Sequence, residues 1–297
     1  MNFDHDQLRA LAAVLDEGTF EAAAARLHVT PSAVSQRVRS LEQQVGRVLV
    51  VRARPCRATE PGQVLARLAA QLAVLEHDAT AQLGDDGRGP GPASPTRLAI
   101  AVNADSLSSW FPAALVGLPG DVVVDLRRED QDRTAELLRD GTVTAAVTAD
   151  AHAVQGCRVL PLGAMRYRAV AAPHAHERWF AGGVDGPALD RAPVLAFNRQ
   201  DALQHRFARR IAGRAVSPPV HHVPSNSAFV ALLVAGLGWG MVPEAAAAGP
   251  LADGTLVELG PEPFWDVPLY WQHWALRTAT LDDLTARVVR AAAAALR

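Results

Sequence analysis

Polar side chains suited to reading a nucleic acid stand at the front of one predicted helix, from Pro31 to Val45. Thr30 is a favourable N-cap, and Pro31 suits the first helical position because its missing N–H leaves no bond unmade there. Apolar residues recur at helical spacing from Val34 onward and predict the buried face. Small hydroxyls, an amide and a guanidinium on the outward face can meet base edges and phosphates in a major groove. The candidate DNA-binding residues of this helix are Thr30, Ser32, Ser35, Gln36 and Arg39.

A basic segment follows this helix, with Arg52, Arg54 and Arg57 placed around Pro55. A short two-stranded ribbon here would lay guanidinium groups along the DNA backbone or into the minor groove. The alternative is a solvated basic loop. We favour DNA contact because the segment comes directly after a predicted helix-turn-helix.

Two further helices are predicted to position the DNA-reading helix. Asp4 to Glu17 has the spacing of an amphipathic helix that stops at Gly18, and Phe20 to Leu27 is an alanine-rich helix former. A tight turn at His28 and Val29 then leads to Thr30. The order of these elements predicts a helix-turn-helix with a wing.

Overall composition indicates a soluble, globular protein with more than one domain: 297 residues, 49% hydrophobic, 20% charged, net charge -2. Positive charge is local, because residues 20–57 contain seven arginines and two acidic residues. The two cysteines, Cys56 and Cys157, are far apart in sequence, and polar residues precede the first apolar run, so we expect no signal peptide. We therefore expect a cytoplasmic protein without membrane association.

A narrow apolar seam from Leu65 to Ala79 predicts one long helix between Pro61 and about Leu83. We expect this helix to pair with its copy in a second chain. The alternative is that the seam packs on its own domain. The glycine- and proline-rich residues 84–95 then predict a flexible joint.

Beyond the joint, strands and helices alternate, which predicts an α/β fold with a largely parallel sheet. The strands are expected near 97–102, 122–129, 144–149, 167–172, 193–197 and 267–276.

Polar residues that follow a strand and open a helix are candidates for ligand binding, because ligands of such sheets occupy the crevice at the carboxyl ends of strands. Asn103, Asp105 and Ser106 form one such group, and Ser225 and Asn226 form another. The alternative for both groups is simple helix capping, which these residue types favour whatever binds nearby.

Catalysis finds little support in the sequence. It contains no glycine-rich phosphate loop, no G-x-S-x-G nucleophile motif and no metal-ligand spacing. His221 and His222 are adjacent and would point to opposite faces of a strand. We expect neither an enzyme nor a bound metal or cofactor.

The segments EAAAARLHVT, PSAVSQRVRSLEQQVG and LVVRARPCRATEPG resemble those of LysR-type transcriptional regulators, and the resemblance covers nearly the whole chain. It implies an N-terminal winged helix-turn-helix plus a long linker helix, then a two-subdomain, periplasmic-binding-protein-like α/β effector domain. Strands would cross between the subdomains near residues 163 and 268. The expected divisions are a DNA-binding domain at 1–60, a dimerisation helix at 61–84, a flexible linker at 85–96, subdomain I at 97–163 with 269–297, and subdomain II at 164–268.

Four more segments, VNADSLSSWFPAAL, REDQDRTAELLRDG, VLAFNRQD and DVPLYWQHW, resemble the lysine- and arginine-responsive, LysG/ArgP-like branch of that family. The effector implied is L-lysine or L-arginine. Such a ligand requires carboxylates for its cationic groups, because an unpaired buried cation is prohibitively unfavourable. Trp110 or Trp239 could stack on the side-chain cation. The candidate effector-binding residues are Asn103, Asp105, Ser106, Trp110, Glu129, Asp130, Asp201, Ser225 and Asn226.

The function expected from these features is sequence-specific transcriptional regulation, of an amino acid exporter gene, in response to a basic amino acid. The expected partners are double-stranded promoter DNA and further copies of the chain, as a homodimer or homotetramer, with RNA polymerase as another candidate if the protein is an activator. Three alternatives stay open: a LysR-type regulator of another small metabolite, a small-molecule binding module that ignores DNA, and an architectural DNA-binding protein.

Overall fold

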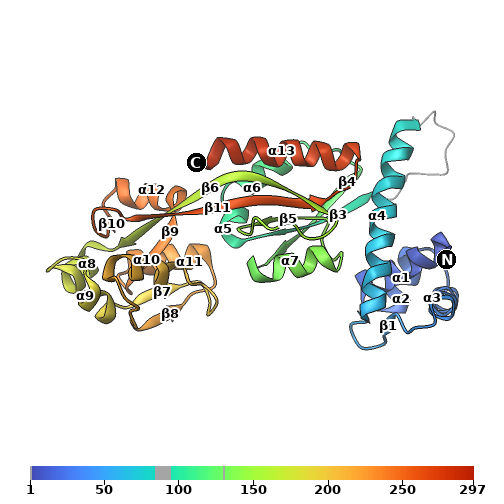
Figure 1. Cartoon of the computed structure of the whole chain (residues 1–297), viewed down its shortest axis with the longest axis horizontal. Helices are drawn as coiled ribbons and strands as arrows, with labels where there is room; N and C mark the ends of the chain where they lie inside the picture. Colours follow the sequence, from blue (N-terminus) through green and yellow to red (C-terminus); the bar gives the residue numbers. More distant parts are fainter. Residues whose placement is uncertain (1, 84–94, 130) are drawn as a thin grey trace. The chain divides into compact units, whose positions relative to one another are not determined.

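The computed structural model describes residues 2–83, 95–129 and 131–297, and Figure 1 labels their helices and strands. These residues group into two units. The first comprises Met1–Val102, Leu115–Leu160 and Trp271–Arg287, as far as they are described, and the second comprises Asn103–Ala114, Pro161–Tyr270 and Val288–Arg297. Among the described residues, no helix is both long enough and apolar enough to cross a membrane.

The first unit begins with three helices: α1 (His5–Glu17), α2 (Phe20–Arg26) and α3 (Pro31–Val45). Their limits follow from local chemistry. The Thr30 hydroxyl accepts a hydrogen bond from the backbone N–H of Ala33 at 3.2 Å, which confirms Thr30 as the N-cap of α3. Helix α1 ends at Gly18, whose φ of 73° is a left-handed conformation that glycine adopts without strain.

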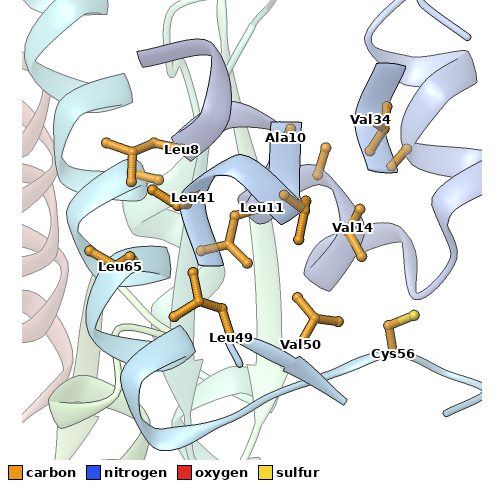
Figure 2. Close-up of a cluster of buried hydrophobic side chains, with 14 of the residues drawn as sticks. Leu8, Ala10, Leu11, Val14, Val34, Leu41, Leu49, Val50, Cys56 and Leu65 are labelled. Atoms are coloured by element: carbon orange, nitrogen blue, oxygen red, sulfur yellow. The ribbon is translucent and has the colours of Figure 1, made fainter. Parts of the chain in front are cut away.

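A hydrophobic cluster holds these helices together, as Figure 2 shows. Val34, Val38 and Leu41 of α3 are fully buried in it, so the predicted apolar stripe is confirmed. The wing closes the cluster through β1 (Val50–Val51), which pairs antiparallel with β2 (Arg57–Ala58). The expected two-stranded ribbon is therefore present.

Helix α4 (Glu60–Leu83) occupies the position of the predicted long helix. Leu65 is buried in the N-terminal cluster, and Leu68 and Leu72 are partly buried against it, whereas Leu75 is 40% exposed. Packing on its own domain, the alternative that the sequence left open, therefore describes the contacts of those three leucines, and pairing with a second chain stays a prediction. Gly62 permits this close packing, since a Cβ there would lie 2.0 Å from the backbone oxygen of Leu49.

The remaining part of the first unit contains β3 (Thr96–Val102), β4 (Val122–Arg128), α7 (Gln131–Arg139) and β5 (Ala145–Thr148). Strand β3 lies between β4 and β5 and is parallel to both. The described part of this sheet thus has the parallel pairing that the sequence predicts, and strands β3 and β4 carry their chain directly toward Asn103 and Glu129.

In the second unit, β7 (Val194–Ala196) is parallel to β8 (Val220–His222) and to β9 (Trp239–Pro243). Strand β6 (Cys157–Ala171) is antiparallel to β9 and to β10 (Val257–Glu258). The helices that lie wholly or partly in this unit are α5 (Ala104–Ser108), α6 (Phe111–Leu115), α8 (Pro173–Phe180), α9 (Gly186–Arg191), α10 (Leu203–Ala212), α11 (Asn226–Val234), α12 (Glu244–Ala252) and α13 (Ala279–Ala295).

Two long strands belong to both units. Strand β6 passes from the first unit to the second between Leu160 and Pro161, and β11 (Phe264–Trp274) returns between Tyr270 and Trp271. These passages lie close to the expected crossings at residues 163 and 268. Strand β6 extends well beyond the predicted 167–172. The prediction is too short because Pro161 and Gly163 are residue types that usually argue against a strand.

Candidate DNA-reading surface and effector site

The front of α3 presents its polar side chains to solvent. Thr30, Ser32, Gln36 and Arg39 are exposed, and Ser35 is half-buried. Thr30 has a second task besides capping, because its hydroxyl lies 2.9 Å from that of Ser32. The arrangement leaves an amide, a guanidinium and hydroxyls free to meet an incoming duplex.

The wing adds three exposed guanidinium groups, those of Arg52, Arg54 and Arg57. Arg52 lies over the Phe20 ring at 4.7 Å, a cation–π contact that fixes its stem near α2. Arg37, by contrast, is already paired with Asp6 at 2.8 Å. Within the described ranges no carboxylate lies at ion-pair distance from Arg39, Arg54 or Arg57, so these cations are available to phosphates.

In the second unit, the residues that follow β3 form a polar cluster around Asp105, which is the candidate effector pocket. Asn103 caps α5 by accepting a hydrogen bond from the Ser106 N–H at 2.8 Å. One oxygen of the Asp105 carboxylate accepts from the Tyr167 hydroxyl at 2.7 Å, and the other accepts from Nδ2 of Asn226 at 3.0 Å. The structure therefore brings Asn103, Asp105, Ser106 and Asn226 together.

Burial changes the acid–base properties of this pocket. Desolvation raises the pKa of Asp105 above its ordinary value, although the hydrogen bonds from Tyr167 and Asn226 oppose the shift. Desolvation, reinforced by the Asp105 charge, also raises the pKa of Tyr167 well above 10, so its hydroxyl stays a donor. No arginine or histidine of the described chain lies at ion-pair distance from Asp105, which leaves a buried carboxylate stabilised by neutral donors alone.

The side chains of Asp201 and Ser225 contact residues close to them in sequence. The Asp201 carboxylate accepts backbone N–H bonds from Phe197 at 2.9 Å and from Leu203 at 3.0 Å. Ser225 is the N-cap of α11 and lies 3.3 Å from the Ser227 hydroxyl. Asp201 is near enough to Asp105 for its negative charge to contribute to the raised pKa. Capping, the alternative that the sequence left open for Ser225, thus describes the role of that residue.

Two buried polar groups beside the pocket lack a hydrogen-bond partner among the described residues: the Ser106 hydroxyl and the indole N–H of Trp110. Ser106 is 0% exposed and Trp110 is 5% exposed. The Trp110 ring meets Phe111 edge-on, with centroids 5.6 Å apart. Trp239 lies instead in a hydrophobic core beside Phe207, with ring centroids 5.8 Å apart, and this packing leaves no ring face free for a ligand cation.

Two more acids, Glu129 and Asp130, are candidates from the sequence. Glu129 follows β4 in the first unit, where its backbone N–H donates to Val102 at 3.3 Å. Asp130 lies outside the described residues.

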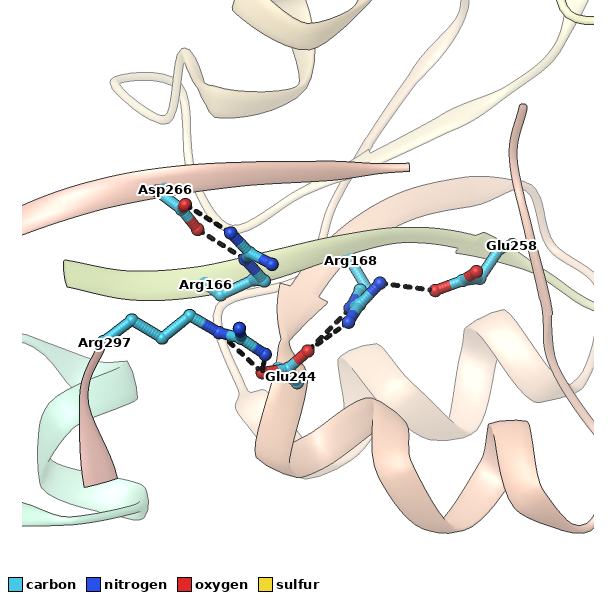
Figure 3. A network of polar contacts seen from close by, with 6 residues as sticks. All are labelled: Arg166, Arg168, Glu244, Glu258, Asp266 and Arg297. Carbon is cyan, nitrogen blue, oxygen red and sulfur yellow. Dashed lines mark hydrogen bonds and ion pairs between the residues drawn. The ribbon is translucent and has the colours of Figure 1, made fainter. Parts of the chain in front are cut away.

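A separate network of ion pairs lies on β6, β10, β11, α12 and the end of the chain (Figure 3). Arg166 binds both oxygens of Asp266 at 2.7 Å, and Arg168 bridges Glu244 and Glu258. Burial alone would raise the pKa of Glu244, but hydrogen bonds from Arg297 and Arg168 hold it below its ordinary value. Each arginine therefore has an acidic partner, and we assign this network a structural role.

Comparison with known protein families places these sites in context. The sequence of bacterial regulatory helix-turn-helix proteins of the lysR family matches residues 5–63, and the LysR substrate binding domain matches residues 93–295. The chain belongs to the LysR family.

Individual relatives match this LysR-family protein along its whole length. The HTH-type transcriptional regulator LysG of Mycobacterium tuberculosis is 53% identical, over 99% of this chain and 94% of that one. The lysine export transcriptional regulatory protein LysG of Corynebacterium glutamicum is 43% identical, over 98% of both. The LysR-family protein is accordingly a transcriptional regulator and not an enzyme.

Solved structures agree with this placement. The crystal structure of ArgP from Mycobacterium tuberculosis has a TM-score of 0.88 at 51% identity, covering 100% of this chain and 99% of that one. Full-length LysG from Corynebacterium glutamicum with bound effector Arg has a TM-score of 0.76 at 41% identity, covering 99% of both chains. The family fold expected from the sequence is therefore confirmed.

Tyr167 donates to Asp105, yet the sequence pattern predicts it only as part of a strand. The signal available was its rarity, since the chain contains two tyrosines, and its position between Arg166 and Arg168, where an apolar strand would rarely carry three polar side chains in a row. Among the described residues, no group of three or more histidines, cysteines and acids is placed to hold a metal ion.

Proposed function

We propose that this LysR-family regulator senses a basic amino acid, L-lysine or L-arginine, and changes its binding to promoter DNA in response. The observation that carries the proposal is the partly buried Asp105 carboxylate, which has donors on both oxygens but no cation beside it among the described residues. A site of this kind gains most from a cationic ligand, because the ligand supplies the missing counter-charge in a poorly solvated place. The Arg-bound LysG structure from Corynebacterium glutamicum supports the same class of ligand.

The proposed effector site comprises Asp105 with its neighbours and the acids that the sequence predicts. The residues assigned to the lining of the site are Asn103, Asp105, Ser106, Trp110, Glu129, Asp130, Asp201, Ser225 and Asn226, to which Tyr167 is added. Trp110 offers its unpaired indole N–H, which is a hydrogen-bond donor for the ligand carboxylate.

For DNA, we assign base-edge and phosphate contacts to the front of α3 and backbone contacts to the wing. Exposure and the lack of intramolecular ion pairs at Arg39, Arg54 and Arg57 support this assignment. The proposed contacts are Thr30, Ser32, Ser35, Gln36, Arg39, Arg52, Arg54 and Arg57. Each phosphate contact adds to a sequence-independent attraction that salt weakens.

The assembly follows from the same proposal. The domains are 1–60 for DNA binding, 61–84 for dimerisation, 85–96 as linker, 97–163 with 269–297 as subdomain I, and 164–268 as subdomain II. Exposed apolar residues on α4, such as Val64 and Leu75, support pairing into a homodimer or homotetramer. Two recognition helices related by a two-fold axis would read a near-palindromic site. The protein would act in the cytoplasm as an activator that contacts RNA polymerase, and its target would be an amino acid exporter gene, in keeping with the name of the Corynebacterium relative.

The test combines two measurements on the full chain. Isothermal titration calorimetry with L-lysine, L-arginine and L-leucine should give binding heat for the two basic amino acids only. Fluorescence anisotropy with the DNA fragment upstream of the protein's own gene should then show an affinity that changes when the bound amino acid is added. Absence of heat with both basic amino acids would refute the effector while leaving the DNA-binding role intact, and equal affinity for that fragment and for random DNA would refute specific regulation.

A further inference from the structure

The side-chain nitrogen of Asn226, at the first residue of α11, is surrounded by three oxygens from α5. Its Nδ2 donates to the Ser108 hydroxyl at 2.7 Å, to the Asp105 carboxylate at 3.0 Å and to the backbone oxygen of Ala104 at 3.2 Å. Ser108 accepts here because its own hydroxyl hydrogen is directed to the Asp105 carbonyl at 3.2 Å. All three oxygens therefore offer lone pairs to one nitrogen.

This set of acceptors exceeds what a carboxamide can satisfy. An amide nitrogen carries two hydrogens, whereas the three oxygens, one of them on a carboxylate, match the three N–H donors of a primary ammonium group. A neutral amide also leaves the buried charge of Asp105 without a cation. In geometry and in charge, the oxygens suit an alkylammonium better than the side chain that now lies among them.

We infer that the Ala104 carbonyl, the Asp105 carboxylate and the Ser108 hydroxyl form the pocket for the effector's α-ammonium group, and that Asn226 is an internal stand-in that fills it when no effector is bound. The inference rests on the proposed function. The α-ammonium group is assigned because lysine and arginine share it, whereas their side chains end in different cations. Asn226 and the effector compete for the same oxygens, so binding exchanges the link between α5 and α11 for contacts with the ligand.

The first experiment removes the competitor. Asn226→Ala should bind L-lysine and L-arginine about tenfold more tightly than the wild type in calorimetry on the full chain, because the ligand no longer displaces a hydrogen bond to a charged group. Ser227→Ala, one residue further along α11, is the matched control and should bind as the wild type does. Circular dichroism melting curves establish that both variants are folded.

The second experiment removes one oxygen of the pocket. Ser108→Ala should weaken binding of both amino acids by about threefold, since the ligand loses a charge-assisted bond and the competitor loses a weaker neutral one. Ser109→Ala is the control, because the Ser109 hydroxyl also donates to the Asp105 carbonyl, at 2.5 Å, yet does not bind Asn226. A general loss of folding would weaken amino acid binding in both variants, so it would not produce a tighter Asn226→Ala and a weaker Ser108→Ala.

A ligand without an α-ammonium group tests the assignment itself. 6-Aminohexanoate should bind Asn226→Ala no more tightly than it binds the wild type. An equal gain for 6-aminohexanoate and L-lysine, or unchanged or weaker L-lysine binding by Asn226→Ala, overturns the stand-in role while the proposed function survives. Failure of the wild type to bind either basic amino acid overturns the proposed function, and this inference with it.

Discussion

The DNA-reading face of α3 and the site around Asp105 carry similar polar residues in different environments, because the first is exposed to water and the second is largely shielded from it. On α3, Gln36 and Arg39 are exposed, and water satisfies them until DNA arrives. Around Asp105, water is scarce, and an unpaired buried polar group costs about 1–3 kcal/mol, so the protein supplies Tyr167 and Asn226 as partners. Exposed side chains that bind a polyanion need no protein partner before DNA binds, because water satisfies them. Shielded groups that bind a small cation need hydrogen-bond partners from their own chain until the ligand binds.

Removal of the Asp105 carboxylate should have a large effect on effector binding. Asp105→Ala should weaken binding of L-lysine and L-arginine by at least about 30-fold, because losing one partner of a buried charge pair costs roughly 2 kcal/mol or more. Calorimetry on the full chain measures the change. Asp253→Asn, an exposed acid in the same unit, is the control, and a similar loss in both variants would show that overall charge matters rather than the pocket.

Removal of a cation from the DNA-reading face of α3 should have a smaller effect on DNA affinity. Arg39→Ala should weaken promoter binding by about tenfold and, if Arg39 contacts a phosphate, lower the slope of log affinity against log salt by about one unit. Fluorescence anisotropy across a salt series measures both quantities. Arg191→Ala removes the same charge from the second unit and should leave the affinity unchanged. An unaltered affinity for Arg39→Ala would remove this residue from the proposed contacts.

The two sites should also differ in their response to acid. The pKa of Asp105 is raised in the free protein, and a bound cation would lower it, so effector affinity should fall severalfold as the pH drops through the raised pKa. Binding should release protons in that range, which titrations in two buffers of different ionisation enthalpy detect. No proton release across the range would argue against contact between Asp105 and the ligand cation.

The smallest expected effect concerns stability. Because the folded-state pKa of Asp105 lies above its unfolded value, the native state holds the proton more tightly, and the stability this gives is lost as pH rises through the folded-state pKa. At pH 7 without ligand, Asp105→Asn should therefore raise the melting temperature, because the uncharged amide avoids the cost of desolvating a carboxylate. Thermal melts of the full chain at pH 5 and pH 7 should show the gain shrinking at the lower pH, and a lower melting temperature at pH 7 would contradict the argument.

How far the sequence predicts each site follows from the range of the contacts involved. The α3 region depends on neighbours: Thr30, Pro31 and Gly46 set the ends of the helix, and the apolar stripe sets its face. Such signals lie within a few residues and can be read directly. The winged helix-turn-helix was predicted nearly element by element for this reason.

The effector pocket depends on residues that are far apart in the chain. Tyr167 lies 62 positions from Asp105, and Asn226 lies 121 positions from it. Sequence patterns identified Asp105 and Asn226 as ends of helices, but only the register of β6 brings Tyr167 to them. Helices α8 and α9 were not predicted, because they are short and lie among prolines and glycines that usually mark loops.

Strand β6 separates residues that would set ligand preference from residues that form stabilising ion pairs. Side chains alternate along a strand, so Tyr167 serves the pocket while Arg166 and Arg168 serve the ion pairs to β11, α12 and β10. Substitutions at pocket residues can therefore change ligand preference while the ion pairs of Arg166 and Arg168 stay intact. A biosensor library that randomises Tyr167 together with Ser108 and Asn226 should yield regulators for new amines that still fold, whereas one that randomises the flanking arginines should mainly lower the stability of the chain.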